Sequence, residues 1–303
     1  MAPDAPTIAV SDLRMRYGTT DVLTGLEFTV TEGEVLTILG PNGAGKTTTV
    51  EILEGFRSRS GGTVEVLGVD PAHGDDAWRA RIGMVLQNWS DHGKWRPRTF
   101  LRHLADHYRP YSQPWDVDEL LELVGLADRA DQRIQRLSGG QRRRLDVAAG
   151  VIGRPSLLFL DEPTTGFDPI ARRDFHDLIH RMSDLEGTTI VLTTHDLAEA
   201  ERLASRILIL AGGRIIADGS PDALTRAAES TAEVRWTVAG QRHVHPSDDA
   251  TSFVRDLLAT DDGAVTDLEV RRASLEESYL TLVEQFEAGE TSAAVSQFTE
   301  ATR

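Results

Sequence analysis

The sequence contains no cysteine, so disulfide bonds and thiolate metal ligands are excluded. It also lacks an uninterrupted apolar run of the roughly 20 residues that a transmembrane helix needs. The first ten residues, MAPDAPTIAV, have neither the basic segment nor the long apolar stretch of a secretory signal peptide. We therefore expect a protein that stays in the cytoplasm.

Positive charge is also scarce, because the formal net charge is −16 and the pI is about 5.0. An acidic chain is a poor general binder of polyanions, and we expect no nucleic-acid partner. The short basic run Arg142, Arg143 and Arg144 is interpreted as one face of a helix. With 303 residues, 40% of them hydrophobic, the chain has room for one large globular domain and one small domain.

One glycine-rich run lies between a predicted strand, residues 34–39 (EVLTIL), and a predicted helix, residues 46–56. Glycines at such a turn let backbone N–H groups and the helix N-terminus surround a phosphate, while Lys46 reaches the terminal phosphates and Thr47 ligates Mg²⁺. An ordinary glycine-rich turn is the alternative, but every fixed position of the phosphate-binding loop is present. The sequence therefore predicts a nucleoside triphosphate site made of Gly40, Pro41, Asn42, Gly43, Ala44, Gly45, Lys46 and Thr47.

Two further motifs narrow the class of triphosphatase. A helix predicted to open at Ser138, Gly139, Gly140 and Gln141 offers either a second anion site or a simple N-cap by Ser138. The apolar run 156–160 (SLLFL) predicts a strand that ends at two adjacent carboxylates, Asp161 and Glu162. One carboxylate suits Mg²⁺ and the other suits the polarisation of a water molecule.

Two polar residues end other predicted strands. Gln87 follows the run 82–86, and His195 follows the apolar run 188–194. Taken singly, each could be an ordinary hydrogen-bonded structural residue. Their order among the other motifs favours functional roles.

In this order, the motifs resemble those of the nucleotide-binding subunit of ATP-binding cassette (ABC) transporters, over about residues 8–227. The resemblance implies an α/β fold with a P-loop ABC ATPase core, an antiparallel β subdomain and an inserted helical subdomain at about residues 88–150. The implied boundaries are 1–228 for the nucleotide-binding domain and 229–287 for a small α+β accessory domain. The small, polar and weakly patterned tail 288–303 is expected to be disordered.

The resemblance also assigns roles to individual residues. Tyr17 is expected to stack on adenine, and the Walker A loop is expected to extend through Thr48. Mg²⁺ ligation is implied for Thr47, Gln87 and Asp161, and catalysis for Lys46, Gln87, Glu162 as general base and His195. The implied ATP contacts include the signature residues Ser138, Gly139, Gly140 and Gln141 and the D-loop aspartate Asp168.

Partners follow from the same resemblance. Two cassettes of this family close head to tail, so we expect a second ABC ATPase subunit, with a homodimer favoured over a heterodimer because every catalytic position is intact. We also expect a separate permease with several membrane spans, and hence a peripheral position on the cytoplasmic face of the cell membrane. Trp89 and Trp95, near basic residues, are either core residues or part of that contact.

Two details indicate a branch of the family. The run 142–148 and the residues Ser274 to Glu277 resemble exporter ATPases of the antibiotic-resistance and lipid-export type, whereas Phe167 departs from the leucine usual in the D-loop. A soluble cassette ATPase acting on ribosomes or DNA, and an importer ATPase, are the alternatives. One cassette without sustained heptads speaks against the soluble alternative. The pair His103 and His107 lacks a third ligand and is not interpreted as a zinc site.

Residues beyond about 230 carry no further motif. We expect a hairpin at 206–217 around Gly212 and Gly213, then a helix from Pro221. Strands are predicted at 233–238 and 264–270, and helices at 252–258 and 275–286, the last with Ser274 and Glu277 at capping-box spacing.

Overall fold

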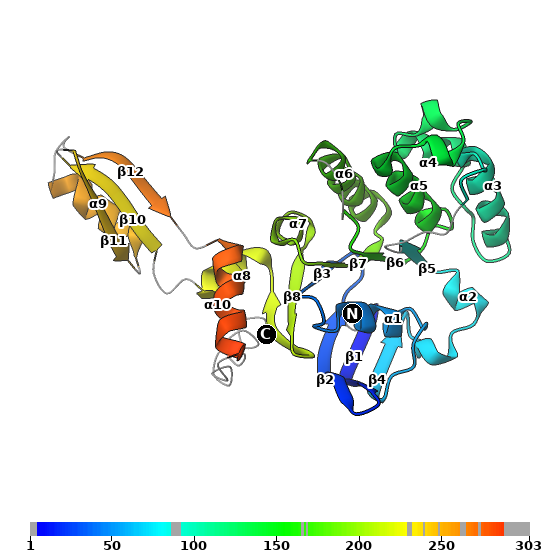
Figure 1. The fold of residues 1–303 in the computed structure, drawn as a ribbon, viewed down its shortest axis with the longest axis horizontal. Coiled ribbons are helices and arrows are strands. Elements are labelled where there is room, and N and C mark those ends of the chain that lie inside the picture. Colours follow the sequence, from blue (N-terminus) through cyan, green and yellow to red (C-terminus); the bar gives the residue numbers. More distant parts are fainter. Residues whose placement is uncertain are drawn as a thin grey trace. The chain divides into compact units, whose positions relative to one another are not determined.

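The computed structural model describes residues 5–85, 92–164, 167, 169–228, 232–238, 240–247, 249–260, 265–271 and 274–287. The chain divides into two compact units, residues 1–215 and 216–303 (Figure 1). The predicted disordered tail, 288–303, lies outside the described residues.

The central element is a six-stranded sheet in the order β5-β6-β7-β3-β8-β9. Within this sheet, the neighbouring strands β5, β6, β7, β3 and β8 pair in parallel. This is expected for continuous apolar runs that are buried on both faces. Gly212 and Gly213 between β8 and β9 have φ values of 53° and 73°, which suit a tight two-residue hairpin turn. The strands are β3 Val35–Leu39, β5 Ile82–Val85, β6 Leu157–Asp161, β7 Thr189–Thr194, β8 Arg206–Ala211 and β9 Arg214–Gly219.

A second sheet, antiparallel and in the order β2-β1-β4, forms the predicted β subdomain. Its strands are β1 Ile8–Tyr17, β2 Thr20–Val30 and β4 Gly61–Val66. Their buried apolar residues join one hydrophobic cluster with helix α1 (Lys46–Leu53) and with Leu157 and Phe159 of β6. This cluster anchors the helix that follows the glycine-rich loop.

The predicted helical subdomain is also present. Three of its helices pack together, and their apolar residues form a second cluster with Leu158 and Leu160, which alternate with the β6 residues of the first cluster. The helices of the subdomain are α3 Pro97–Tyr108, α4 Val117–Leu123 and α5 Gly139–Val151, with 3₁₀ turns η2 Ala127–Arg129 and η3 Ile134–Arg136. The other helical segments of this unit are α1 Lys46–Leu53, η1 Pro71–His73, α2 Asp76–Arg79, α6 Pro169–Glu186 and α7 Leu197–Leu203.

The division into compact units falls after residue 215, and helix α8 (Pro221–Ala228) groups with the C-terminal unit. There α8 packs against the last described helix, α10 (Leu275–Glu287). Leu224 of α8 and Leu275 and Leu282 of α10 are buried. The predicted domain boundary at 228/229 stays a prediction.

The C-terminal unit also contains a three-stranded antiparallel sheet in the order β11-β10-β12, with helix α9 (Ala250–Thr260) against β10. Strands β10 (Ala232–Val238) and β12 (Val265–Arg271) were predicted, but β11 (Gln241–Ser247) was not. The sequence of β11, QRHVHPS, is mostly polar and contains a proline, which is tolerated at the edge of a sheet. The edge position explains why the strand lacks an apolar pattern.

Candidate nucleotide site

The glycine-rich loop connects β3 to α1 as predicted, although the helix ends at Leu53 rather than at Phe56. Gly45 caps α1 in a left-handed conformation, with φ 104°. A Cβ atom on Gly45 would lie 2.5 Å from Leu23 Cδ2, so a side chain there would be both strained and crowded. The loop therefore places the free N–H groups of the first turn of α1 at the cleft described below.

Lys46, the first residue of α1, is 7% exposed. Its ammonium group donates hydrogen bonds to the carbonyl oxygens of Gly40 (2.7 Å) and Pro41 (3.3 Å), and its Nζ lies 3.9 Å from Glu162 Oε1. Burial lowers the pKa of Lys46, whereas the charges of Glu162 and Asp161 raise it and oppose that effect. The cation is thus held between the phosphate loop and the carboxylates at the end of β6.

Asp161 and Glu162 are fixed by the neighbouring strand β7. Asp161 lies opposite Thr193 in the register of β6 and β7, and the Thr193 hydroxyl donates to the Asp161 carboxylate. The N–H of Glu162 donates to the carbonyl oxygen of Thr193 at 3.1 Å. Glu162 has a φ of 46°, a left-handed conformation that is uncommon for a residue with a side chain. Because of this conformation, the carboxylates of Asp161 and Glu162 point in different directions.

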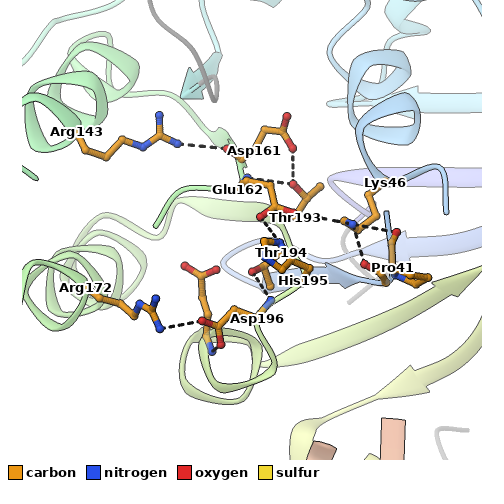
Figure 2. Close-up of polar contacts among 12 residues, drawn as sticks. Pro41, Lys46, Arg143, Asp161, Glu162, Arg172, Thr193, Thr194, His195 and Asp196 are labelled. Carbon is orange, nitrogen blue, oxygen red and sulfur yellow. Dashed lines mark hydrogen bonds and ion pairs between the residues drawn. The ribbon is translucent and has the colours of Figure 1, made fainter. Parts of the chain in front are cut away.

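His195, at the end of β7, completes the group. Its Nδ1 lies 2.6 Å from Glu162 Oε2, and the Glu162 side chain is largely buried. Figure 2 shows Lys46, Glu162 and His195 converging from α1, the end of β6 and the end of β7. Asp196, the next residue, caps α7 and accepts a hydrogen bond from Arg172 of α6 at 2.8 Å.

Most of the predicted site residues line one cleft of about 500 Å³. Gly40, Pro41 and Ala44 are not in its lining, although the carbonyl groups of Gly40 and Pro41 bind Lys46. Gln87, Asp168 and Trp89 lie outside the described residues. The predicted residues in the lining are Tyr17, Asn42, Gly43, Gly45, Lys46, Thr47, Thr48, Asp161, Glu162 and His195.

The signature residues are not among those that line this cleft in the described part of the chain. They open helix α5, where the Ser138 hydroxyl accepts from the N–H of Gln141 and the Gln141 side chain accepts from the N–H of Ser138. This capping box confirms the predicted helix start. It satisfies two backbone groups within the turn and leaves other first-turn N–H groups for a ligand.

Tyr17 is 40% exposed at the mouth of the cleft. The guanidinium carbon of Arg57 lies 5.1 Å from the centroid of its ring, and Arg57 is itself bound to Glu51 at 2.6 Å. Sequence reasoning did not identify Arg57, because nothing in the local pattern places it over an aromatic ring 40 residues earlier. A cation on a ring face stabilises the ring's orientation.

Glu54, the C-cap of α1, is a buried carboxyl that the sequence did not single out. Burial, with smaller contributions from the charges of Asp161 and Glu51, raises the pKa of Glu54 to about 8. The folded state therefore retains a proton that the unfolded chain, with a pKa near 4.5, releases. The resulting stability is complete below about pH 4.5 and is lost as the pH rises to about 8.

We expect Glu54→Gln, which cannot ionise, to become progressively more stable than the wild type as the pH rises from about 5 to about 9. The difference in the free energy of unfolding should reach a few kcal/mol, at about 1.4 kcal/mol per unit of pKa shift. Urea denaturation at both pH values measures it. Glu119→Gln, at an exposed position of α4, is the matched control and should show no such trend. A Glu54→Gln difference that is the same at both pH values would contradict the buried, protonated carboxyl.

The oxygen donors of the cleft fit Mg²⁺. The ion prefers hard oxygen ligands and usually binds through one or two protein groups together with substrate phosphates. Thr47 supplies a hydroxyl and Asp161 a carboxylate, and both line the cleft beside Lys46. Within the described ranges, at the cleft or away from it, no group of three or more His, Asp or Glu side chains could by itself hold a metal ion.

Comparison with known proteins gives the family. The model of the ABC transporter family matches residues 23–165. The daunorubicin/doxorubicin resistance ATP-binding protein DrrA of Streptomyces peucetius is 36% identical over an alignment of 304 positions that covers 91% of this chain and 91% of that protein. The Nod factor export ATP-binding protein I of Rhizobium meliloti (strain 1021) is 40% identical over 225 residues, 72% of this chain and 66% of that protein.

The structural comparison agrees. The ATP-binding subunit of an ABC transporter superposes with a TM-score of 0.65 at 25% identity, covering 91% of this chain and 99% of that chain. The chain therefore belongs to the ABC transporter family, and it is an ATP-hydrolysing subunit of that family. Such subunits act in pairs with a separate transmembrane permease. Among the residues that the structure describes, no helix is both long enough and apolar enough to span a bilayer.

Proposed function

We propose that this chain is the ATP-hydrolysing motor of an exporter, and that Glu162 is its general base. The observation that carries the proposal is the convergence of Lys46, Glu162 and His195 beside the phosphate loop in one cleft. Glu162 takes a proton from the attacking water, and His195 holds the Glu162 carboxylate through its 2.6 Å contact. Lys46 neutralises charge on the terminal phosphates.

The remaining residues bind and orient the substrate. The N–H groups of the loop and of the first turn of α1 bind phosphate oxygens, and Tyr17 stacks on the adenine with Arg57 behind it. Thr47 and Asp161 would hold Mg²⁺, and we expect Gln87 to be a further ligand. When bound, Mg²⁺ neutralises charge on the phosphate oxygens. The Thr193 hydroxyl keeps the Asp161 carboxylate in place.

The separate location of the signature supports a head-to-tail pair. In that arrangement, Ser138, Gly139, Gly140 and Gln141 of one copy complete the phosphate site of the other, and Asp168 lies at the contact between them. We favour a homodimer, because every catalytic position is intact in the sequence of this chain. ATP binding then closes the pair, and hydrolysis opens it.

The export direction and the substrate class are suggested by the relatives. Two of them are named for daunorubicin resistance or Nod factor export, and none of the relatives described above is named as a translation, repair or import protein. We propose a drug-like, antibiotic or lipid-like substrate, which is bound by the permease. The chain then lies at the cytoplasmic face of the cell membrane, attached through that permease.

Trp95 is a candidate for the permease contact. It is 37% exposed, and its ring packs against His103 of α3 at a centroid distance of 5.2 Å and against Phe100 at 6.2 Å. A partly exposed tryptophan that is supported from behind is the kind of residue that anchors protein interfaces. Trp95→Ala should weaken the contact with the permease and preserve nucleotide binding.

Affinity purification tests the proposal. Tagged Glu162→Gln would be purified from gently solubilised membranes in the presence of ATP. Two further variants would be purified in parallel: Trp95→Ala, which should weaken the permease contact, and Lys46→Met, which should weaken ATP binding. We expect one stoichiometric partner with several membrane spans, in lower yield with either variant. Recovery with ribosomes, nucleic acid or soluble proteins alone would refute the exporter motor and leave the ATPase assignment standing.

A further inference from the structure

The three consecutive arginines of α5 do not form a single solvent-facing helix face, so this interpretation of the run is wrong. Arg142 is exposed, and Arg144 is half-buried and bound to Asp174 of α6 at 3.0 Å. Arg143 is 8% exposed and points into the protein, toward the end of β6 (Figure 2). A buried guanidinium must be matched by acceptors, so its contacts are informative.

Those acceptors are main-chain groups on both sides of Glu162. Arg143 Nε donates to the carbonyl oxygen of Pro163 at 2.9 Å, and Nη2 donates to the carbonyl oxygen of Asp161 at 3.3 Å. Asp146, one turn along α5, lies 4.0 Å from Arg143 Nη1 and balances part of its charge. The planar guanidinium fork reaches two acceptors in a fixed geometry, which a lysine ammonium cannot reproduce.

The peptide group between Asp161 and Glu162 is thereby held from both sides. Its carbonyl oxygen accepts from Arg143, and its N–H donates to Thr193 of β7. This peptide precedes the residue whose φ of 46° is unfavourable for a side chain by about 1–2 kcal/mol. Such a conformation persists only where the surrounding contacts enforce it.

We propose that Arg143 is a positioning residue for the reaction, which fixes the left-handed backbone of Glu162 and so aims its carboxylate at the attacking water. This inference rests on the proposed role of Glu162 as general base. Arg143 is not among the described residues that line the nucleotide cleft. It acts through Glu162, and because it lies on the helix that begins with the signature, it ties the base to that helix.

The test uses the full-length chain and the variant Arg143→Met, which keeps the length of the side chain and removes the donors. We expect kcat for ATP hydrolysis to fall about 10- to 100-fold, because small misplacements of a catalytic group cost up to about 100-fold. KM and the affinity for a fluorescent ATP analogue should stay within about twofold, because the phosphate loop is unchanged. Arg142→Met, at the exposed neighbouring position, is the matched control and should hydrolyse ATP like the wild type.

A double-mutant cycle with Glu162→Gln separates positioning from a general structural role. If Arg143 acts through Glu162, adding Arg143→Met to Glu162→Gln should lower kcat by less than about twofold further. The proposal would be overturned if the losses in kcat from the two substitutions multiplied in the double variant, or if Arg143→Met lost ATP affinity in parallel with kcat. A folded Arg143→Met with wild-type kcat would also overturn it.

Arg143→Lys keeps the positive charge that faces Asp146 but lacks the planar guanidinium group. It therefore tests the positioning role if Arg143→Met does not fold. An intermediate kcat is expected, and wild-type turnover would overturn the proposal.

The general-base hypothesis for Glu162 and the positioning hypothesis for Arg143 are contradicted by different results. Wild-type turnover by Glu162→Gln alone would remove the base, and the Arg143 proposal with it. Normal turnover by an Arg143 variant beside an impaired Glu162→Gln would remove only the Arg143 proposal.

Discussion

Replacing Glu162 by glutamine is expected to leave ATP binding intact and to lower the rate of hydrolysis by about 10²- to 10⁴-fold, the usual contribution of a positioned general base. The amide has nearly the same shape as the carboxylate and can still contact His195, which lies 2.6 Å from the Glu162 side chain. It cannot accept a proton from water. The loss should therefore appear in kcat and not in the affinity for ATP.

Single-turnover hydrolysis and equilibrium binding of ATP measure the two quantities separately. Glu201→Gln, at an exposed position of α7, is the control and should behave like the wild type. Near-normal turnover by Glu162→Gln would show that another group activates the water. Loss of ATP binding would instead show that Glu162 supports the nucleotide itself.

Replacing Lys46 by methionine should weaken ATP binding by about 30- to 4,000-fold, since removal of one partner of a buried charge contact costs about 2–5 kcal/mol and about 1.4 kcal/mol corresponds to tenfold. The same change should alter the free energy of unfolding of the nucleotide-free protein by no more than about 1 kcal/mol. The hydrogen bonds lost to Gly40 and Pro41 are offset by removal of a charge whose pKa burial lowers.

The sequence offers an unusually clean control for this experiment, because it contains only two lysines, Lys46 and Lys94. Lys94 is exposed, and Lys94→Met should bind ATP like the wild type. Titration with ATP and urea denaturation without it give the two readouts. Unchanged ATP affinity in Lys46→Met would contradict the phosphate-binding role of Lys46, and a large loss of stability would make it a structural residue.

The parts of the fold that were predictable are those with a local chemical signal. Parallel strands buried on both faces, such as β3 and β7, are continuous apolar runs, and the glycine-rich loop and the Ser138 cap mark where helices begin. Strand β11 has no such signal, because a polar edge strand is stabilised by pairing rather than by burial. The contact of α8 with α10 likewise has no local signal, because it joins segments far apart in sequence.

In the candidate site, too, only the residues with a local sequence signal could be predicted. Lys46, Asp161, Glu162 and His195 were predicted from motifs, and the structure brings them to one cleft. The supporting role of Thr193 depends on which residue of β7 lies opposite Asp161, and a strand's own sequence does not encode its register with another strand. The buried position of Arg143 depends in turn on how α5 packs against the end of β6, which a run of three arginines leaves open.

Alternate residues of β6 are buried in two different apolar clusters, so both faces of this strand are protected from solvent. Leu157 and Phe159 belong to the apolar cluster of the β subdomain, and Leu158 and Leu160 belong to that of the helical subdomain. If one cluster loosens, β6 remains covered on its other face and hydrogen-bonded to β5 and β7. Its amide hydrogens therefore exchange with solvent only in rare openings that disrupt both clusters, so Asp161 and Glu162 extend from one of the most slowly exchanging segments of the chain.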